Sequence, residues 1–474
     1  MLQVWYGEML AIPSPGAYRR GLLRLGLYPR KGRLPRGERR IVDPDMGRQA
    51  CDTPEEAARL QQALDSGRIV CAAVNTPECV WLPRGLLPEV QRYCPVEVVD
   101  RRLAFQPIDW HWRSDLVPAQ RAAVEQVVTG GGGLLEATTG GGKTRCAIAA
   151  IACWHQPVAW LTHRRDLVHM ARDAILKCCD LPQEAIGQIG DDGDWFGNYA
   201  TVAMVQSLAA RPDRLAQLAR RVGAVVLDEA HHSPAISFLE VISHFPAAYR
   251  LGLTGTLDRP DGLGPLAMAV LGPGYVRIEQ QALVDAGLVI VPEIVMVDSG
   301  YVHGGDSSWN FLQQSRARDW SRNARICQIV REETSRGGRV AISVSRRDHA
   351  ELLAEMLGTQ FGIRAVAVLG TMPTEQRARV YAAVAAGQCS LIATQLFDEG
   401  VNLPELDVIV GAAQGRSPIQ AAQRMGRLMR NWRGKPRPRF YDICDMQVPV
   451  LAEHAQERYR LYLARNWLVE RQGA

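Results

Sequence analysis

The pattern of apolar and polar positions changes at about residue 116 of the chain. From there on, short runs of Val, Leu and Ala alternate with stretches of helical periodicity. Short apolar runs bounded by turn residues predict buried strands, and strands that alternate with helices indicate a parallel sheet covered on both faces. In this first block we expect strands at 134–135, 158–161, 202–205, 224–227 and 250–253, and helices at 165–177 and 214–221.

The same alternation resumes after a looser stretch at residues 298–308. The strands expected in this second block lie at 340–343, 365–369, 391–393 and 408–410, with helices at 347–357 and 375–386. We therefore predict an α/β fold with two tandem parallel-sheet domains, at 106–280 and 281–449. A C-terminal helical tail is expected at 450–474, with its helix running from about 450 to 471.

The first 105 residues differ from the rest of the chain. Glycine and proline punctuate short apolar runs, which predicts a small mixed α/β accessory domain over residues 1–105. Nine residues from Arg19 to Arg40 are basic and only Glu38 is acidic, which makes this the densest cluster of charge in the chain. Proline and glycine make the second half of the cluster a loop rather than a helix face.

The overall composition is that of an ordinary globular protein, with 47% hydrophobic and 22% charged residues. Lys and Arg outnumber Asp and Glu by 55 to 50, a mild excess that is compatible with a polyanionic partner without requiring one. The eleven cysteines include no CxxC pair, which favours free thiols in a reducing compartment over a zinc or iron–sulfur site. The chain shows no signal-peptide pattern and no apolar run of the ~20 residues that span a bilayer, so we expect a cytoplasmic protein.

A glycine-rich segment lies between an expected strand and a helical stretch. It reads Ala137-Thr-Thr-Gly-Gly-Gly-Lys143-Thr144, with Ala137 in place of the first glycine of the general phosphate-binding pattern. Such a turn directs backbone N–H groups and a helix N-terminus at phosphate oxygens. We expect Lys143 to reach the β- and γ-phosphates of ATP and Thr144 to ligate Mg²⁺. The residues expected to form the cradle around the phosphates are Thr139, Gly140, Gly141 and Gly142.

Two adjacent carboxylates follow the strand expected at 224–227. The chain continues there as Asp228-Glu229-Ala230-His231. Asp228 is expected to hold Mg²⁺, and Glu229 to position and polarise the water that attacks ATP. A single carboxylate at a strand end is common on solvated surfaces, but this tetrad after a phosphate-binding loop is improbable by chance. The two motifs together predict an ATPase.

A third motif lies in the second α/β domain, in the segment Gln423-Arg-Met-Gly-Arg427-Leu-Met-Arg430. Arg427 and Arg430 are three residues apart, so on a helix they would share one face. Two guanidinium groups on a face that meets the first domain would stabilise charge on the γ-phosphate during its transfer. The alternative is that these arginines contact a nucleic-acid backbone.

These three motifs, in this order, resemble those of superfamily 2 of the helicases, and the resemblance extends over roughly residues 106–445. It implies two RecA-like domains that close on ATP and Mg²⁺. The stretch 115–120 resembles the segment in which a glutamine, here Gln120, reads adenine. Val117 and Ala119 stand where an arginine and an aromatic residue are usual. The side chains that would then stack on adenine are those of Trp110, Trp112 or Arg113.

Further stretches resemble helicase motifs that grip nucleic acid or couple that grip to hydrolysis. Residues 161–167 and 202–208 resemble motifs Ia and Ib, and residues 344–347 and 393–404 resemble motifs IV and V. The resemblance implies that nucleic acid is held chiefly through its phosphates. The implied contacts are Arg164, Arg165, Gln206, Ser207, Arg346 and Thr394. The residues implied in coupling hydrolysis to domain movement are His231, Thr254, Thr256 and Gln423.

Within the superfamily, the stretches 161–167, 228–231, 253–257 and 282–292 are most similar to the group that includes XPB and UvsW. That similarity implies a duplex or branched DNA substrate. Three alternatives stay open: an RNA helicase, a binding module whose ATP site is a conformational switch, and the motor subunit of a restriction or defence complex.

The basic loop from Arg30 to Arg40 could contact the same polyanion as the motor that follows it in the chain. Six of its eleven residues are Arg or Lys. We therefore hypothesise that it is an accessory nucleic-acid grip, with a solvated charged surface as the simpler alternative.

Overall fold

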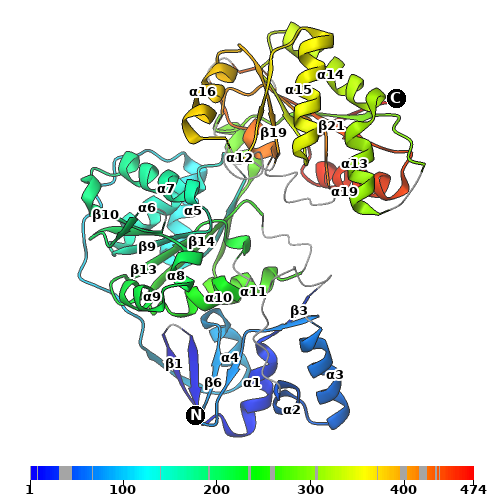
Figure 1. The fold of residues 1–474 in the computed structure, drawn as a ribbon. Helices are drawn as coiled ribbons and strands as arrows, with labels where there is room; N and C mark the ends of the chain where they lie inside the picture. Colours follow the sequence, from blue (N-terminus) through cyan, green and yellow to red (C-terminus); the bar gives the residue numbers. More distant parts are fainter. Residues whose placement is uncertain are drawn as a thin grey trace. The chain divides into compact units, whose positions relative to one another are not determined.

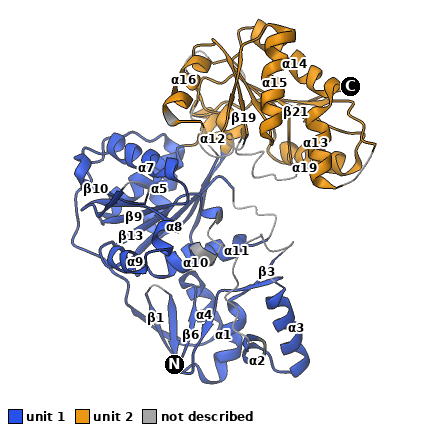
Figure 2. Cartoon of the chain, in the orientation of Figure 1, with its two compact units in different colours: residues 1–138, 142–279 blue, residues 139–141, 280–474 orange. Residues whose placement is uncertain are grey.

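The computed structural model describes residues 2–7, 9–30, 45–66, 68–138, 140–190, 193–232, 236–256, 262–304, 308–370, 372–394, 403–415, 424–432, 435–436 and 438–473. The chain divides into two compact units, residues 1–138 with 142–279 and residues 139–141 with 280–474 (Figure 2). Thr139, Gln423 and all of the basic loop except Arg30 lie outside the described residues, as does most of the motif V stretch.

The first unit opens with a five-stranded mixed sheet in the order β5-β6-β2-β1-β7 (Figure 1). β1 is parallel to β7, and the other neighbours are antiparallel. The strands are β1 (Leu2–Tyr6), β2 (Leu10–Pro13), β5 (Val74–Asn75), β6 (Cys79–Leu82) and β7 (Val96–Asp100). The other elements of this part are α1 (Arg19–Leu25), β3 (Leu27–Pro29), α2 (Met46–Ala50), α3 (Pro54–Asp65), β4 (Ile69–Cys71) and α4 (Leu87–Tyr93).

A buried arginine joins this small sheet to the rest of the first unit. The Arg84 side chain is 3% exposed and donates to the carbonyl oxygens of Ala247 at 2.6 Å and Ala248 at 3.2 Å. Next to it, Gly85 approaches the backbone so closely that a Cβ there would come within 2.5 Å of the Ala269 carbonyl oxygen. One hydrophobic core continues from the small sheet into the following domain. The accessory part is therefore packed firmly against the rest of the first unit.

The larger sheet of the first unit has eight strands in the order β11-β10-β12-β9-β13-β14-β8-β15. All neighbouring strands are parallel except β10 and β11. The strands are β8 (Gly132–Ala137), β9 (Val158–Thr162), β10 (Ile186–Gly190), β11 (Gly193–Trp195), β12 (Ala200–Met204), β13 (Ala224–Leu227), β14 (Tyr249–Thr254) and β15 (Tyr275–Ile278). The helices between them are α5 (Pro118–Thr129), α6 (Lys143–Trp154), α7 (Arg165–Cys178), α8 (Val205–Ala209), α9 (Pro212–Ala219), α10 (Ile236–Ser243) and α11 (Gly264–Leu271).

The second unit contains a seven-stranded sheet in the order β18-β19-β17-β20-β21-β16-β22, in which all neighbours are parallel. The strands are β16 (Glu293–Asp298), β17 (Val340–Ser343), β18 (Ala365–Val368), β19 (Ser390–Ala393), β20 (Val408–Gly411), β21 (Arg439–Cys444) and β22 (Leu468–Gln472). Its helices include α12 (Gln280–Asp285), α13 (Trp309–Arg318), α14 (Trp320–Ser335), α15 (Arg347–Phe361), α16 (Thr374–Ala385) and α19 (Pro449–Ala464). The predicted α/β fold with two parallel sheets is thus confirmed.

The C-terminal segment differs from its prediction as a helix reaching residue 471. Helix α19 ends at Ala464, and Asn466 adopts a positive φ of 54°, a conformation that asparagine tolerates better than most residues. The chain then forms β22, which pairs with the edge of β16 from Glu293↔Leu468 to Val297↔Gln472. Hydrogen bonding to this open edge overrides the helical prediction. Among the described helices, none has the length and apolar character needed to cross a membrane.

Candidate functional site

The residues singled out in the first unit gather at one edge of its larger sheet. Strands β8, β14, β13, β9 and β12 are neighbours or near neighbours and run parallel, so their carboxyl ends meet at that edge. This is where ligands bind in open α/β sheets. The phosphate-binding loop follows β8, the carboxylate pair follows β13, and the motif Ia and Ib loops follow β9 and β12.

The phosphate-binding loop joins β8 to α6, which begins at Lys143. Gly142 has a φ of +82°, and a Cβ there would come within 2.2 Å of the Gln120 amide nitrogen, so only glycine fits. The Lys143 ammonium group donates to the carbonyl oxygen of Ala137 at 3.1 Å, across the mouth of the loop. Thr144 is the second residue of α6, at the helix N-terminus where backbone N–H groups attract phosphate.

Gln120 lies against this loop and is 1% exposed. Its amide oxygen accepts from the Val117 N–H at 3.2 Å at the start of α5. The side chain therefore connects α5 to the loop, and its contact with adenine stays a prediction.

Trp110 is not available to stack on adenine, which corrects the alternative drawn from the sequence. Its ring is 1% exposed, donates through Nε1 to the Gln156 carbonyl oxygen at 3.1 Å, and packs edge-on against Tyr199. A large apolar ring gains more from burial in the core than from an open position. Arg113 is exposed and pairs with Asp180.

The carboxylate pair at the end of β13 is electrostatically strained. Burial and the neighbouring Glu229 raise the pKa of Asp228 to about 7, while Lys143 and the Glu229 N–H act in the opposite direction. That N–H donates to the Asp228 carboxylate at 2.9 Å. Glu229 itself has a φ of +50°, which is uncommon for a side chain of this size and typical of functional sites. The two carboxylates together need a cation or a proton.

A chain of polar contacts leads from Glu229 into the sheet. His231 Nδ1 lies 3.3 Å from the Glu229 carboxylate and 3.4 Å from the Thr254 hydroxyl at the end of β14. The Thr254 hydroxyl donates to the Thr256 carbonyl oxygen at 2.7 Å. The structure thus brings together three of the four predicted coupling residues, while Gln423 lies outside the described residues.

Sequence reasoning missed one residue of this cluster, His163. It follows β9, which is paired with β13 up to Leu161↔Leu227, so it lies level with Glu229. Burial lowers the pKa of His163 to about 4, with Glu229, His231 and Arg164 close enough to act on its charge. The ring is therefore neutral at physiological pH. Its place inside the motif Ia stretch, next to the arginines, was the available signal.

The predicted nucleic-acid contacts of the first unit lie on the two neighbouring loops after β9 and β12. Arg164 precedes α7 and is partly exposed, with Asp166 at 3.6 Å, and Arg165 is exposed. Gln206 is exposed at the start of α8, whereas Ser207 packs against Gly190 at the end of β10. Three of the four side chains can thus meet a ligand directly, and Ser207 is more enclosed.

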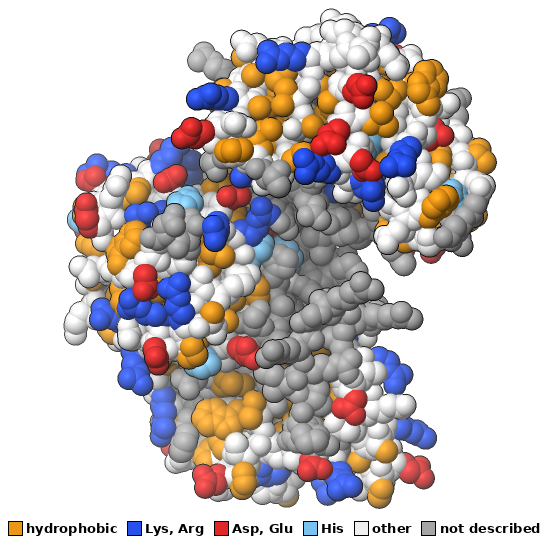
Figure 3. All heavy atoms as spheres, in the orientation of Figure 1, with side chains coloured by type: hydrophobic (Ala, Val, Ile, Leu, Met, Phe, Trp, Pro, Cys, Tyr) orange, Lys and Arg blue, Asp and Glu red, His pale blue; other side chains and the backbone are white. Residues whose placement is uncertain are grey.

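In the second unit, Arg346 and Thr394 follow the neighbouring strands β17 and β19. Arg346 forms a two-pronged pair with Asp348 at 2.9 and 3.0 Å, and this hydrogen bonding lowers the pKa of the Asp348 carboxyl. Figure 3 shows basic and acidic side chains interspersed over the visible described surface, in line with the small net charge.

The two candidate arginine fingers do not share a helix, which corrects the prediction. Residues 424–428 are helical, so Arg427 lies in the helix, but Arg430 lies beyond its end in a bridge with Val289. The Met429 carbonyl oxygen accepts from the Ile290 N–H at 2.7 Å, and this long-range pairing ends the helix. Burial lowers the pKa of the Arg430 guanidinium.

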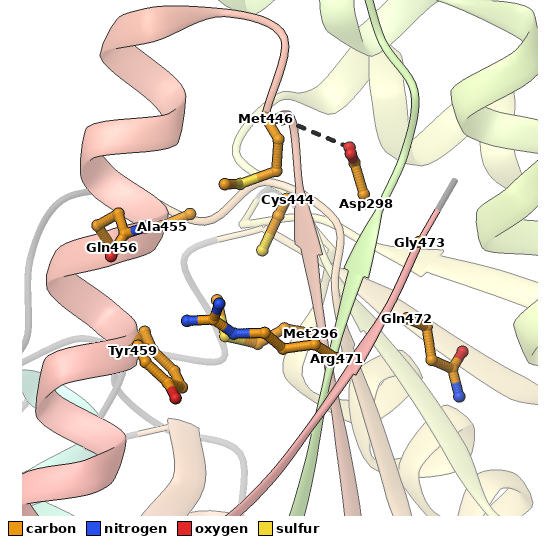
Figure 4. Close-up of a pocket in the computed structure, with 10 residues that line it drawn as sticks. All are labelled: Met296, Asp298, Cys444, Met446, Ala455, Gln456, Tyr459, Arg471, Gln472 and Gly473. Carbon is orange, nitrogen blue, oxygen red and sulfur yellow. Dashed lines mark hydrogen bonds between the residues drawn. The ribbon is translucent and has the colours of Figure 1, made fainter.

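A pocket of about 190 Å³ opens at the carboxyl ends of β16, β21 and β22, beneath α19 (Figure 4). The Arg471 guanidinium lies over the Tyr459 ring, 3.8 Å from its centre, and Met296 and Cys444 line the apolar wall. This pocket belongs to the same sheet edge as Arg346 and Thr394, yet none of the predicted site residues lines it.

Comparison with known proteins gives two family matches. Residues 113–259 match the type III restriction enzyme res subunit, and residues 321–431 match the helicase conserved C-terminal domain. The chain is 26% identical to the Rad25-type DNA 3'-5' helicase of Halobacterium salinarum, over 69% of this chain and 54% of that one. It is 25% identical to the DNA 3'-5' helicase XPB of Kineococcus radiotolerans, over 72% and 62%. The chain thus spans between about half and two thirds of the length of these relatives.

Solved structures share the fold at low sequence identity. A Dbp5 variant of S. cerevisiae bound to RNA and ADP BeF3 matches with a TM-score of 0.55 and 15% identity, over 75% of this chain and 89% of that one. The DNA-bound restriction-modification enzyme LlaBIII matches with a TM-score of 0.57 and 13% identity, over 80% and 33%. These structures show the shared fold. The ordered motifs, the two family matches and the similarity to the helicases named above place the chain in superfamily 2 of the helicases, in the group that includes XPB and phage helicases.

Proposed function

We propose that this chain is an ATP-dependent motor that couples ATP hydrolysis to the unwinding or remodelling of duplex or branched DNA. The observation that carries the proposal is the gathering of the Lys143 loop, the Asp228–Glu229 pair and the motif Ia and Ib loops at one sheet edge. A nucleotide at this edge lies within a few strand spacings of a nucleic-acid strand. A change in the position of the nucleotide can therefore alter the loops that contact the nucleic-acid strand, and the reverse.

The residues fit a bound Mg²⁺ ion. The raised pKa of Asp228 reflects a buried carboxylate beside Glu229, a surplus of negative charge that a divalent cation relieves. Asp228 and the Thr144 hydroxyl would hold the ion, and both are the oxygen ligands that Mg²⁺ prefers. When bound, Mg²⁺ neutralises charge on the β- and γ-phosphate oxygens.

Hydrolysis then depends on four side chains of this chain. Lys143 turns from the Ala137 carbonyl oxygen to the phosphates, and Glu229 accepts a proton from the attacking water. Arg427 and Arg430 stabilise the charge that develops on the γ-phosphate when the two domains close, which is the role of arginine fingers. Domain closure and reopening then move one nucleic-acid grip relative to the other.

Coupling would run through the polar chain from Glu229 to Thr256. His231 touches both the catalytic carboxylate and Thr254, so a change at the nucleotide shifts the residues after β14. We also propose the domain boundaries 1–105, 106–280, 281–449 and 450–474 as the functional divisions of the motor, with the last one folded onto the third.

DNA is the substrate proposed because the two relatives described above carry the name DNA 3'-5' helicase. An RNA substrate is the second candidate, favoured by similarity to a mimivirus protein named as an ATP-dependent RNA helicase, at 22% identity. ATP turnover measured without cofactor and with single-stranded DNA, duplex DNA, forked DNA and RNA distinguishes the two.

The expected result is stimulation by duplex or forked DNA and little by RNA. Glu229→Gln is expected to bind ATP yet hydrolyse none, whereas Lys143→Ala loses turnover because the phosphates lose their charge partner. A Glu229→Gln protein that hydrolyses ATP at the wild-type rate would show that another group activates the water. If RNA alone stimulates ATP turnover, the substrate is RNA and the proposal of DNA is wrong.

A further inference from the structure

Lys435 lies among backbone oxygens from two segments of the second unit. Its ammonium group donates to the carbonyl oxygens of Leu428 at 2.8 Å, Pro404 at 3.0 Å and Arg430 at 3.2 Å. Leu428 and Arg430 belong to the segment with the two candidate fingers, and Pro404 ends the motif V stretch. An ammonium group has three donors, so these contacts use all of them.

The contacts hold the end of the helix that contains Arg427 and the residues directly after it. The carbonyl oxygens at the end of a helix lack partners within it and carry partial negative charge, which a cation stabilises. Lys435 binds the carbonyl oxygen of Leu428, the last helical residue, and that of Arg430, two residues beyond the helix, and the Ile290 N–H binds that of Met429 between them. Three consecutive carbonyl oxygens are therefore held, two of them by one side chain. The backbone that carries Arg430 is fixed as a result.

Lysine is a rare residue in this chain. Of the 55 Lys and Arg residues, only four are lysines: Lys31, Lys143, Lys177 and Lys435. Arginine serves nearly everywhere else as the cation. A planar guanidinium directs its donors in a fork, whereas a compact ammonium group suits three oxygens gathered around one point. At position 435 the geometry of the site, and not charge alone, calls for lysine.

Burial makes the charge of Lys435 sensitive to pH just above neutrality. Burial lowers its pKa to about 8, with Arg339 and Arg430 acting in the same direction and Asp407 and Glu405 against it. Asp407 is buried and lies 3.7 Å from Arg339. Lys435 therefore loses most of its positive charge between pH 7 and 9.5.

We propose that Lys435 is a positioning residue for ATP hydrolysis, which holds the segment of Arg427 and Arg430 against Pro404 in its working conformation. The inference rests on the proposed function, because the fingers act only when ATP is hydrolysed. If the two arginines are misplaced, the transition state of hydrolysis is stabilised less, whereas the binding of ATP to the open protein does not change. Loss of Lys435 therefore lowers kcat and leaves the KM for ATP nearly unchanged.

The test compares DNA-stimulated turnover of the full chain and of Lys435→Met, which keeps the length of the side chain and removes its charge and donors. We expect kcat at pH 7 to fall about 10- to 100-fold, a fraction of the roughly 10³–10⁵-fold that an arginine finger can contribute. The ratio of wild-type to variant kcat should shrink as pH rises from 7 to 9.5, because the wild type then loses its ammonium charge. A purely structural contribution to folding would not produce this pH-dependent ratio in kcat.

Lys177→Met is the matched control, since Lys177 is exposed in the last turn of α7, far along the chain from these motifs. Its kcat should equal that of the wild type at every pH. If Lys435→Met proves unstable, Lys435→Arg keeps the charge and should show a kcat that does not decline between pH 7 and 9.5.

Two variants separate this inference from the proposed function. Arg427→Ala and Arg430→Ala should each lose at least 10-fold in kcat. If they do and Lys435→Met stays within twofold of the wild type, or if its kcat ratio is flat with pH, the positioning role is wrong and the fingers stand. If neither arginine variant loses activity, the finger assignment fails and this inference fails with it.

Discussion

Replacing Asp228 with Asn should stabilise the protein while it abolishes ATP turnover. The pKa of Asp228 is raised from its ordinary value to about 7 by burial and by Glu229. In the unfolded chain an aspartate titrates near 3.9. Because the folded-state pKa is the higher one, the ionised carboxylate opposes folding. This cost is absent below about pH 4, grows as pH rises towards 7, and is constant above it.

A folded-state pKa near 7 against about 3.9 in the unfolded chain corresponds to at most about 4 kcal/mol of destabilisation above pH 7. Asparagine keeps the oxygen that accepts the Glu229 N–H at 2.9 Å and removes the charge. The melting temperature of nucleotide-free protein without Mg²⁺ should therefore rise by on the order of 5 °C at pH 8 and much less at pH 5.

Thermal denaturation at the two pH values provides the measurement. Asp180→Asn is the control, because Asp180 is an exposed carboxylate paired with Arg113 and surface pairs contribute only about 0–1 kcal/mol. An equal gain for Asp228→Asn at pH 5 and pH 8, or no gain at pH 8, would refute the charge argument. ATP turnover by this variant would refute the assignment of Asp228 to Mg²⁺.

Two further predictions concern charge elsewhere in the chain. Asp445→Ala should destabilise the second unit by about 3–5 kcal/mol, measured by urea unfolding. The reason is that Arg322, 2.8 Å from Asp445, and Arg316 would remain buried without their carboxylate. A loss of less than about 1 kcal/mol would contradict this prediction. Alanine substitution in the basic loop should weaken DNA binding and reduce the slope of log affinity against log salt by about 0.9 per lost contact. ATPase activity without DNA should not change. If neither the slope nor the affinity changes, the loop is only a solvated charged surface. The residues to replace together are Arg30, Lys31, Arg33 and Arg36.

Most of the sheet framework was predictable from the sequence, because buried parallel strands are marked by their own apolar residues. The runs at 224–227 and 340–343 coincide with β13 and β17. Strand β22 could not be recognised in this way. Its residues Leu-Val-Glu-Arg-Gln are mostly exposed, and its conformation depends on the edge of β16, about 170 residues earlier in the chain.

In the candidate site, too, some residues could be predicted from the sequence and others could not. The phosphate-binding loop and Asp228–Glu229 have sequence patterns because their chemistry depends on short spacings. Lys435 has no such pattern, and His163 is marked only by its place inside the motif Ia stretch, because the contacts of both side chains form only in the folded chain. The position of Arg430 outside the helix likewise follows from its bridge to Val289.

The pairing of β22 with β16 has a mechanical consequence. β16 is the first strand of the second unit's sheet in chain order and β22 is its last, and the two are parallel over five residue pairs. A pull between the start of β16 and the end of β22 would load their hydrogen bonds in shear, so that all of them resist together instead of opening one by one. If the chain is the motor proposed above, this arrangement helps the domain withstand load, because tension between these two points would not separate the strands one hydrogen bond at a time.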